Sequence, residues 1–345
     1  MTSKATSIDI AYRAGVSQST VSRALRNSPL VNLETRQRIQ AIAKELNYKV
    51  DKNASNLRTQ NSLTLALLIC EDPTNDDSMI NPFFLSMLGS ITRATARQGY
   101  DLLVSFQQLS TDWHADYEDS NKADGIILLG YGDYMDYAHK LETLIEKNTH
   151  FVIWGAEHNN KAVLSIGCDN HQGGLIATEH LLKLGHRHIA FLGDASGHSP
   201  EFRDRYLGHV DALTSAGITA NKQLQHHAIN TEASGYDAAM ALLDAGITFD
   251  AVFTASDLIA IGAIRALKKR GVLVPEQVAV VGYDDIPVAS FANPALTTVK
   301  QDTKYAGEIL VESILKLIRG EEVSQRLIQT SLVIRGSCGA NIDER

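Results

Sequence analysis

Residues 6–25 read TSIDIAYRAGVSQSTVSRAL, and this stretch decides the fold of the amino-terminal region. Thr6, followed three residues later by Asp9, is the pattern of a helix start in which the two residues cap each other's backbone amides. Gly15 can adopt the left-handed conformation that ends a helix, and Ser17 can cap a second one. The stretch therefore predicts two short helices joined by a tight turn. The side chains expected to face inward are Ile8, Ala11, Ala14, Val21, Ala24 and Leu25.

A third helix is expected after the second. The second helix spans residues 18–26, and residues 27–29 (Asn-Ser-Pro) end it. Asn32 can cap the third, in which apolar residues recur with helical spacing at Ile39, Ile42, Ala43 and Leu46. Two short helices joined by a glycine-containing turn are the plan of a helix-turn-helix, whose second helix enters the major groove of DNA. Geometry alone also fits small three-helix domains with other uses.

Charge is divided unevenly along the chain. Residues 1–60 carry ten Lys or Arg and four Asp or Glu, a net charge of +6, whereas the rest carries −14 and the whole chain −8. A basic head on an acidic body can confine the binding of a polyanion to the head. The alternative is that these cations only solvate a helical surface.

Length and composition limit the class of protein. The chain has 345 residues, of which 44% are hydrophobic and 21% charged, as expected for two or three folded domains. No apolar run approaches the roughly 20 residues of a membrane span, and the amino terminus lacks the apolar segment of a signal peptide. Cys70, Cys168 and Cys338 are too far apart for a disulfide framework or a close-spaced zinc motif. We therefore expect a cytoplasmic protein.

The run from residue 8 to residue 25 resembles the head of the lactose/galactose repressor family of bacterial regulators. Residues 27–31, 34–36, 46–48 and 53–59 continue the resemblance, which extends over essentially the whole chain. Lys49-Val50-Asp51 departs from it, because the family usually has proline and asparagine after the tyrosine. The resemblance implies a set of DNA-binding residues: Ser17, Gln18, Ser19, Thr20, Ser22, Arg23, Asn53, Leu57 and Arg58. Gln and Arg can each form paired hydrogen bonds to base edges.

Residues 51–62 are the expected hinge. They are too few and too polar to form a stable helix alone. The resemblance implies that the segment becomes helical when two copies meet on operator DNA, and that Leu57 wedges into the central base step of the minor groove. Such unstacking costs a few kcal/mol and allows a bend that brings more protein onto the duplex. Alternatively, Leu57 packs on the body.

From residue 63 onward, apolar strand patterns alternate with amphipathic helices. The expected strands are 64–70, 101–106, 125–129, 151–155, 189–193, 251–254 and 278–282. The expected helices are 83–98, 134–147, 173–184, 203–216, 235–243, 258–269 and 305–318. Short Val/Ile/Leu runs without alternation indicate parallel sheets covered on both faces, and ligands of such sheets bind beyond the carboxyl ends of the strands.

The body resembles the two-lobed periplasmic-binding-protein fold of the same family. The expected fold class is thus α/β: an all-α helix-turn-helix head and a hinge, then a type I periplasmic-binding-protein-like body of two lobes with doubly wound parallel sheets. The resemblance and the strand ends together mark candidate effector-binding residues: Asn81, Phe83, Trp154, Asp169, Arg205, Ser256, Asp257 and Asp284.

Among these, Arg205 and Asp284 resemble the charged pair that binds the family's effector. A carboxylate, a guanidinium and aromatic faces together suit a polyhydroxylated ligand. Arg205 and Asp284 could instead form a structural ion pair, and Phe83 and Trp154 could simply pack in the core.

Motifs of catalysis are absent from the sequence. Gly130-Tyr131-Gly132 is a GxG, but Met135 stands where a dinucleotide-binding glycine is needed. There is no Walker A run, no G-x-S-x-G and no H-E-x-x-H. The close histidine pairs 186/188 and 226/227 have no evident third ligand. We therefore expect no catalytic residue, no metal site and no cofactor.

The sequence thus predicts a DNA-binding transcriptional repressor controlled by a small molecule, with a sugar or sugar metabolite acting as inducer. The expected domains are 1–50 for DNA binding, 51–62 for the hinge and 63–345 for effector binding and dimerisation. The expected partners are a near-palindromic operator, a small-molecule effector of carbohydrate type and a second copy of the chain. We expect a dimer rather than the tetramer that some family members form, because no leucine heptads precede Arg345. A purine- or nucleoside-responsive regulator, or one that needs a co-repressor, remains open. A stand-alone sugar-binding protein or a sugar-modifying enzyme is a remote alternative, disfavoured by the basic head.

Overall fold

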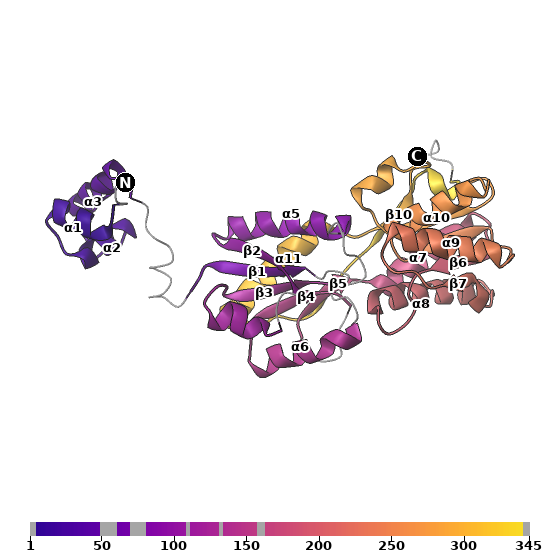
Figure 1. Cartoon of the computed structure of the whole chain (residues 1–345), viewed down its shortest axis with the longest axis horizontal. Helices are drawn as coiled ribbons and strands as arrows, with labels where there is room; N and C mark the ends of the chain where they lie inside the picture. Colours follow the sequence, from indigo (N-terminus) through magenta and orange to yellow (C-terminus); the bar gives the residue numbers. More distant parts are fainter. Residues whose placement is uncertain are drawn as a thin grey trace. The chain divides into compact units, whose positions relative to one another are not determined.

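The structure is a computed structural model that describes residues 5–48, 61–69, 81–107, 111–130, 134–156 and 163–340. It divides into two compact units, Met1–Ser62 and Leu63–Arg345. The expected hinge residues Asn53, Leu57 and Arg58 lie outside the described residues, as does Cys70. Figure 1 labels the elements used below.

The first unit holds a three-helix head made of α1 (Ser7–Ala14), α2 (Gln18–Leu25) and α3 (Leu33–Glu45). Thr6 and Asp9 form the expected capping box, Ser17 caps α2 and Asn32 caps α3. Gly15 is left-handed, with φ of 62°. The local sequence therefore fixes all three helix starts and the turn between α1 and α2.

The head has a small core in which one predicted member is wrong. Ile10 is fully buried, whereas Ile8 is 64% exposed. Ile8 lies in the first turn of α1, and the buried positions of that helix are Ile10, Ala11 and Ala14. The other predicted residues, Val21, Ala24, Ile39 and Ala43, are buried as expected, and Leu25, Ile42 and Leu46 pack partly against them.

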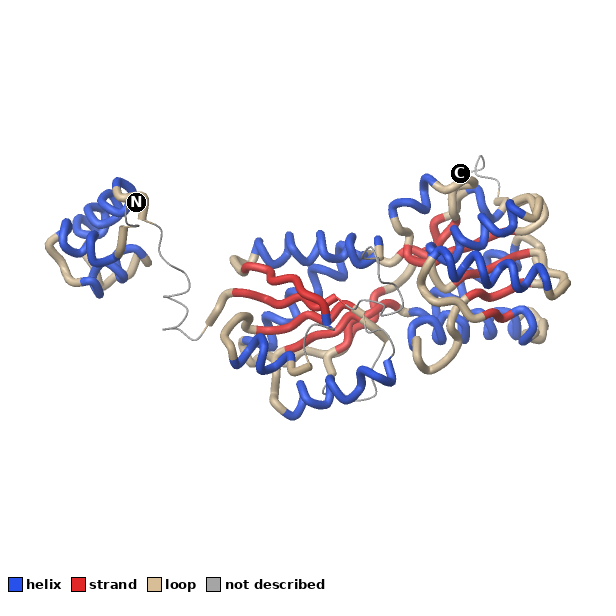
Figure 2. Tube along the Cα trace, viewed as in Figure 1, coloured by secondary structure: helices blue, strands red, loops and turns tan. Residues whose placement is uncertain are grey.

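The second unit contains two six-stranded sheets, which define two lobes (Figure 2). The first sheet has the order β11-β5-β4-β3-β1-β2 and is parallel throughout. Its strands are β1 (Thr64–Ile69), β2 (Asp101–Phe106), β3 (Gly125–Leu129), β4 (Phe151–Trp154), β5 (Ser165–Cys168) and β11 (Arg326–Ile328). Helices α5 (Pro82–Arg97) and α11 (Thr303–Ile318) pack together, and α6 (Tyr134–Glu146) lies across the sheet from them (Figure 1). A π-helical turn, η2 (His114–Asp119), precedes β3.

The second sheet has the order β12-β10-β9-β8-β6-β7, and only β12 runs antiparallel. Its strands are β6 (Ile189–Leu192), β7 (Gln225–His226), β8 (Ala251–Thr254), β9 (Ala279–Asp284), β10 (Thr297–Lys300) and β12 (Ser331–Val333). Its longer helices are α7 (Asn170–Lys183), α8 (Pro200–Ser215), α9 (Glu232–Asp244) and α10 (Asp257–Lys269). Short 3-10 turns are η3 (Lys222–Leu224), η4 (Pro287–Phe291) and η5 (Gly336–Cys338).

Glycines allow the helices of this lobe to approach closely in pairs. A Cβ at Gly174 of α7 would lie 2.0 Å from the carbonyl oxygen of Arg205, and one at Gly262 of α10 would lie 2.0 Å from that of Glu232. The pairs α7–α8 and α9–α10 therefore pack backbone against backbone. This contact fixes the position of α8, which carries Arg205.

Along its described residues the chain crosses between the lobes three times, after β5, after β10 and after β11. Each lobe therefore contains segments distant in sequence, and α11 and β11 complete the first lobe from near the carboxyl terminus (Figure 1).

The expected fold class is confirmed, but the list of strands was incomplete. β5, β7, β10, β11 and β12 were not predicted, because each has only two to four residues and several contain Ser, Thr, Gln or Arg. Three helix starts, those of α7, α8 and α9, were placed three residues late; Asp169 caps α7 and Thr231 caps α9.

Candidate functional sites

The turn at Gly15 positions α2, the expected recognition helix, against α1. Val16 donates its N–H to the carbonyl of Ala11, which closes the turn. Val21 and Ala24 anchor α2 in the core, so Gln18, Ser19 and Arg23 are left exposed on its other side. This is the geometry that a helix needs to present polar side chains to a groove.

Hydrogen bonds organise part of this polar surface. Ser17 Oγ lies 2.8 Å from Ser19 Oγ and 2.9 Å from Thr20 Oγ1. Gln18 Nε2 donates to Ser7 Oγ over 2.8 Å. Arg26 donates to Ser22 Oγ over 2.9 Å. Among these bonds, the one from Gln18 to Ser7 links the amino-terminal end of α2 to α1.

Arg23 differs from its neighbours, because its side chain makes no hydrogen bond or salt bridge with any described residue. Its guanidinium therefore needs no internal bond broken before it meets a phosphate or a base edge. Sequence reasoning missed Tyr12, which is 89% exposed beside a shallow depression that also includes Gly15 and Gln18. Tyr12 is an aromatic residue outside the predicted apolar positions of the first helix, and this could have marked it as a surface contact.

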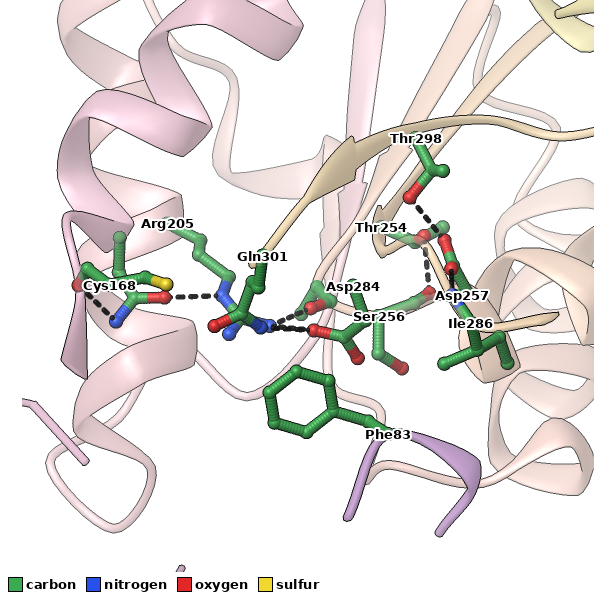
Figure 3. Close-up of polar contacts among 12 residues, drawn as sticks. Phe83, Cys168, Arg205, Thr254, Ser256, Asp257, Asp284, Ile286, Thr298 and Gln301 are labelled. Atoms are coloured by element: carbon green, nitrogen blue, oxygen red, sulfur yellow. Dashed lines mark hydrogen bonds and ion pairs between the residues drawn. The ribbon is translucent and has the colours of Figure 1, made fainter. Parts of the chain in front are cut away.

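In the body, Arg205 of α8 is the centre of a buried polar cluster (Figure 3). It is 5% exposed, and its Nε donates to Asn170 Oδ1 over 2.9 Å. Its Nη1 donates to the carbonyl oxygen of Ala255 and lies 3.6 Å from Asp284 Oδ1. The ring of Tyr283 lies under the guanidinium, 3.7 Å from its carbon to the ring centroid. The cation is thus held in one orientation.

Asp284 ends β9 and is 6% exposed. Its φ of 113° is a conformation that L residues rarely adopt, and Gln301 donates to its Oδ1 over 2.6 Å. Burial raises the pKa of this carboxyl to about 6, although Arg205 and Gln301 act in the opposite direction. Strain and a perturbed pKa at one residue are typical of functional sites.

Ser256 and Asp257 lie at the start of α10 and are both fully buried. Ser256 caps the helix through the N–H of Ile259. Asp257 accepts hydrogen bonds from Thr298 Oγ1 over 2.5 Å and from the N–H of Ile286 over 2.8 Å. Burial, and then the nearby Asp284 carboxyl, raise its pKa well above the ordinary value. Asp257 therefore fastens the β9–η4 turn that carries Asp284 (Figure 3).

The first lobe contributes Asn81, Phe83 and Trp154. Asn81 caps α5 through the N–H of Phe83. The Phe83 and Trp154 rings are each 6% exposed, with centroids 6.2 Å apart. The Phe83 ring points toward Asp284 in Figure 3.

Of the predicted effector residues, the structure places Arg205 beside Asp284 and Phe83 beside Trp154. Asp169 follows β5, caps α7 and is half-buried. Sequence reasoning missed Gln301 and Tyr283. Gln301 directly follows β10, so the same rule about strand ends could have found it had that strand been predicted.

The described residues offer neither a metal site nor a membrane-spanning helix. Within the described ranges, no three His, Cys, Asp or Glu side chains are grouped as a metal ion would require. In the same part of the chain, every helix is too short or too polar to span a bilayer.

The fold and these two sites define a class of protein, in which a helix-turn-helix head is joined to a two-lobed body with a buried polar cluster at the strand ends. Residues 8–51 match the bacterial regulatory proteins of the lacI family, and residues 178–338 match the periplasmic binding protein-like domain.

Relatives match along almost the whole chain. The transcriptional regulator AscG of Escherichia coli (strain K12) is 31% identical over 339 residues, covering 96% of this chain and 98% of that protein. CelR of Thermobifida fusca is 31% identical, with 95% and 96% covered. The lac repressor dimer bound to operator and an anti-inducer is similar in structure, with a TM-score of 0.85, 28% identity and 98% and 100% covered. The CelR–cellobiose complex has a TM-score of 0.72, 29% identity and 96% and 99% covered.

The chain belongs to the lacI family of bacterial regulatory proteins. It is a sequence-specific DNA-binding transcriptional repressor under the control of a small molecule. The expectation drawn from residues 8–25 is thereby confirmed. The roles of the individual side chains named above stay predictions.

Proposed function

We propose that the chain acts as a cytoplasmic homodimer that releases its operator when a carbohydrate inducer binds the Arg205–Asp284 cluster. In this proposal, residues 1–50 read DNA, 51–62 form the hinge, and 63–345 bind the effector and dimerise. The division of the structure into Met1–Ser62 and Leu63–Arg345 supports separate DNA-binding and effector-binding units.

The observation that carries the proposal is the buried pair of Arg205 and Asp284. Together they offer guanidinium donors and carboxylate acceptors, which match the hydroxyl groups of a polyol. The Phe83–Trp154 ring pair adds apolar faces, as the ring carbons of a sugar require. A relative, CelR, has been solved with cellobiose, which supports a carbohydrate here.

A bound carbohydrate can act on DNA only through its preference for one arrangement of the two lobes. The cluster draws on separate parts of the second unit: α8, the end of β9 and, through Gln301, the crossover into α11. A ligand that forms hydrogen bonds to α8, to the end of β9 and to Gln301 therefore stabilises one conformation of the crossover into α11. Couplings of this kind typically change affinity by about 1–3 kcal/mol. The proposal contains no catalytic step.

The test uses the full chain and a matched pair of substitutions on α8. Arg205→Ala removes the buried cation, and Arg203→Ala removes an exposed one two residues earlier. Operator sequences are first selected from genomic fragments. A thermal-shift screen of sugars and nucleosides then finds the effector, and fluorescence anisotropy measures release from labelled operator.

We expect Arg205→Ala to bind the operator with near-normal affinity and to lose the response to the effector, whereas Arg203→Ala keeps both. Loss of response in both variants, or in neither, removes Arg205 from the site. A response to nucleosides alone, or tighter operator binding with a sugar, contradicts the inducer proposal while leaving the DNA-binding assignment intact. Turnover of the ligand would contradict the absence of catalysis.

A further inference from the structure

A cavity of about 400 Å³ lies in the second lobe, away from the Arg205–Asp284 cluster. Its wall includes Ile189 and Gln225, the first residues of β6 and β7. It therefore opens at the amino ends of these strands, whereas the proposed effector site lies at the carboxyl ends. We call it the distal cavity. Its other lining residues used below are Arg187, Phe191, Tyr206, His209, Ala220 and Asn221.

His209 is the polar group buried in the wall of the distal cavity. It lies on α8 one helical turn after Arg205 and is 3% exposed. Burial lowers the pKa of its imidazole to about 3, so the ring is neutral at physiological pH. A neutral imidazole carries one proton, and its two nitrogens are therefore one donor and one acceptor.

The hydrogen bonds of Thr178 decide which nitrogen carries the proton. Thr178 Oγ1 donates its single proton to the carbonyl of Gly174 over 2.9 Å. The same oxygen lies 2.9 Å from His209 Nδ1, so it accepts from Nδ1–H. We assign the proton to Nδ1, because the hydroxyl proton of Thr178 is used at the Gly174 carbonyl, and Nε2 is then an acceptor. The hydrogen bond of the ring to a described residue is made by Nδ1, and Nε2 is left available to a bound molecule.

Three aromatic rings pack against the imidazole of His209, and those of Phe191 and Tyr206 also line the cavity. The Phe191 ring is stacked on His209, with centroids 5.9 Å apart and an interplanar angle of 29°. The ring centroids of Tyr206 and Phe253 lie 6.2 and 6.1 Å from that of His209. An acceptor in a cavity wall that has no protein donor can accept a hydrogen bond from a bound molecule, and aromatic walls favour flat apolar partners. The cavity therefore combines one unused acceptor with faces that suit a planar ring.

We propose that the distal cavity is a second small-molecule site, which takes a small planar aromatic or heteroaromatic compound whose hydroxyl or N–H group donates to His209 Nε2. The volume lies at the lower end of ligand pockets, which suits a compound of one or two rings. Polar side chains, among them Arg187, Asn221 and Gln225, also line the wall, so they can accommodate a polar substituent on such a compound. This site is independent of the proposed effector site.

The experiment compares two probes that differ only in the donor. 4-Bromophenol can donate a hydrogen bond, and 4-bromoanisole, its methyl ether, cannot. Equilibrium dialysis measures the affinity of each probe for the full-length protein, and bromine anomalous scattering from soaked crystals locates the probe. His209→Phe keeps an aromatic ring and removes the acceptor. Ala220→Phe places a bulky ring at the half-buried cavity wall and leaves His209 in place.

We expect 4-bromophenol to occupy the distal cavity with its oxygen within hydrogen-bond distance of Nε2, and to bind about five- to tenfold more tightly than 4-bromoanisole. His209→Phe should abolish that preference, and Ala220→Phe should weaken both probes. Operator binding and circular dichroism check that each variant folds. If His209→Phe fails to fold, the proposal is tested by comparing the affinities of the two probes for the wild type and for Ala220→Phe.

Equal affinity for the two probes would overturn the proposal, because it would mean that the cavity is an unspecific void. Bromine peaks only outside the cavity, or water alone bonded to Nε2 at saturating probe, would also overturn it. None of these results bears on the carbohydrate proposal, which depends on Arg205 and Asp284.

Discussion

Asp284 should make the body less stable as the pH rises from acid toward neutrality. The folded-state pKa of about 6 lies above the ordinary carboxyl value of 3.8, because burial disfavours the charged form. The folded protein therefore binds more protons than the unfolded chain between these pH values. The stability that this adds is fully present below pH 3.8 and is lost as the pH rises through about 6.

The size of the effect follows from the two pKa values. They correspond to about 3 kcal/mol in total, of which about 2 kcal/mol is lost between about pH 4.5 and pH 7. Asp284→Asn replaces the carboxyl with an amide of similar shape that does not titrate. The free energy of unfolding of the wild type minus that of Asp284→Asn should therefore fall by about 2 kcal/mol over this interval.

Urea unfolding followed by tryptophan fluorescence measures this difference. Both tryptophans, Trp113 and Trp154, belong to the body, so the signal reports the unit that contains Asp284. Asp237→Asn, which changes an exposed carboxyl on α9, is the control and should leave the pH dependence of the wild type unchanged. A difference between wild type and Asp284→Asn that stays constant from pH 4.5 to pH 7 would refute the reasoning.

Four further outcomes are expected. Gly174→Ala should lower the free energy of unfolding in urea by about 1–3 kcal/mol, because the new Cβ would meet the Arg205 carbonyl. Gly89→Ala in α5, where nothing lies within 4 Å of the new Cβ, should be neutral or slightly stabilising. Equal effects of the two substitutions would contradict the close α7–α8 contact. Leu57→Ala should weaken operator binding far more than binding to random DNA, and equal losses in the two titrations would reject the wedge. Operator affinity should fall steeply with salt, since head Lys and Arg displace counterions, and a flat plot of log affinity against log salt would argue against docking by the head. Inducer affinity should fall below about pH 6 as Asp284 gains a proton, by up to about tenfold per pH unit, and calorimetry showing no change would exclude a carboxylate contact.

Local sequence was sufficient for the head. Thr6, Gly15, Ser17 and Asn32 each act on backbone groups within a few residues of themselves, so their roles can be predicted without knowing the tertiary structure. Ile8 was misplaced because three short helices bury only part of each apolar stripe, and which part depends on how the helices cross.

The strands of the body were predictable where they are central and apolar. The strands that were missed next to the crossovers are short: β5, β10, β11 and β12. At each of them the chain passes from one lobe to the other, and no local sequence pattern indicates such a crossover. Gln301 was overlooked because β10, the strand that it follows, was not predicted.

The effector cluster shows a different limit. Arg205 and Asp284 are far apart in sequence, and their pairing was expected only from the family resemblance. The burial of Asp257 and the proton position on His209 depend on tertiary contacts with Thr298 and Thr178, respectively. Such features need coordinates, because they arise between elements whose spacing along the chain is unrelated to their distance in space.

The three crossovers between the lobes have a consequence for how this body can be altered by recombination. Because α11 and β11 return to the first lobe after the second lobe is nearly complete, no single breakpoint separates the two lobes into continuous gene segments. Exchanging one lobe with that of a homologue requires at least three junctions, placed after β5, β10 and β11. Chimaeras made with one junction should inherit a first lobe of mixed parentage, in which α11 meets a foreign α5.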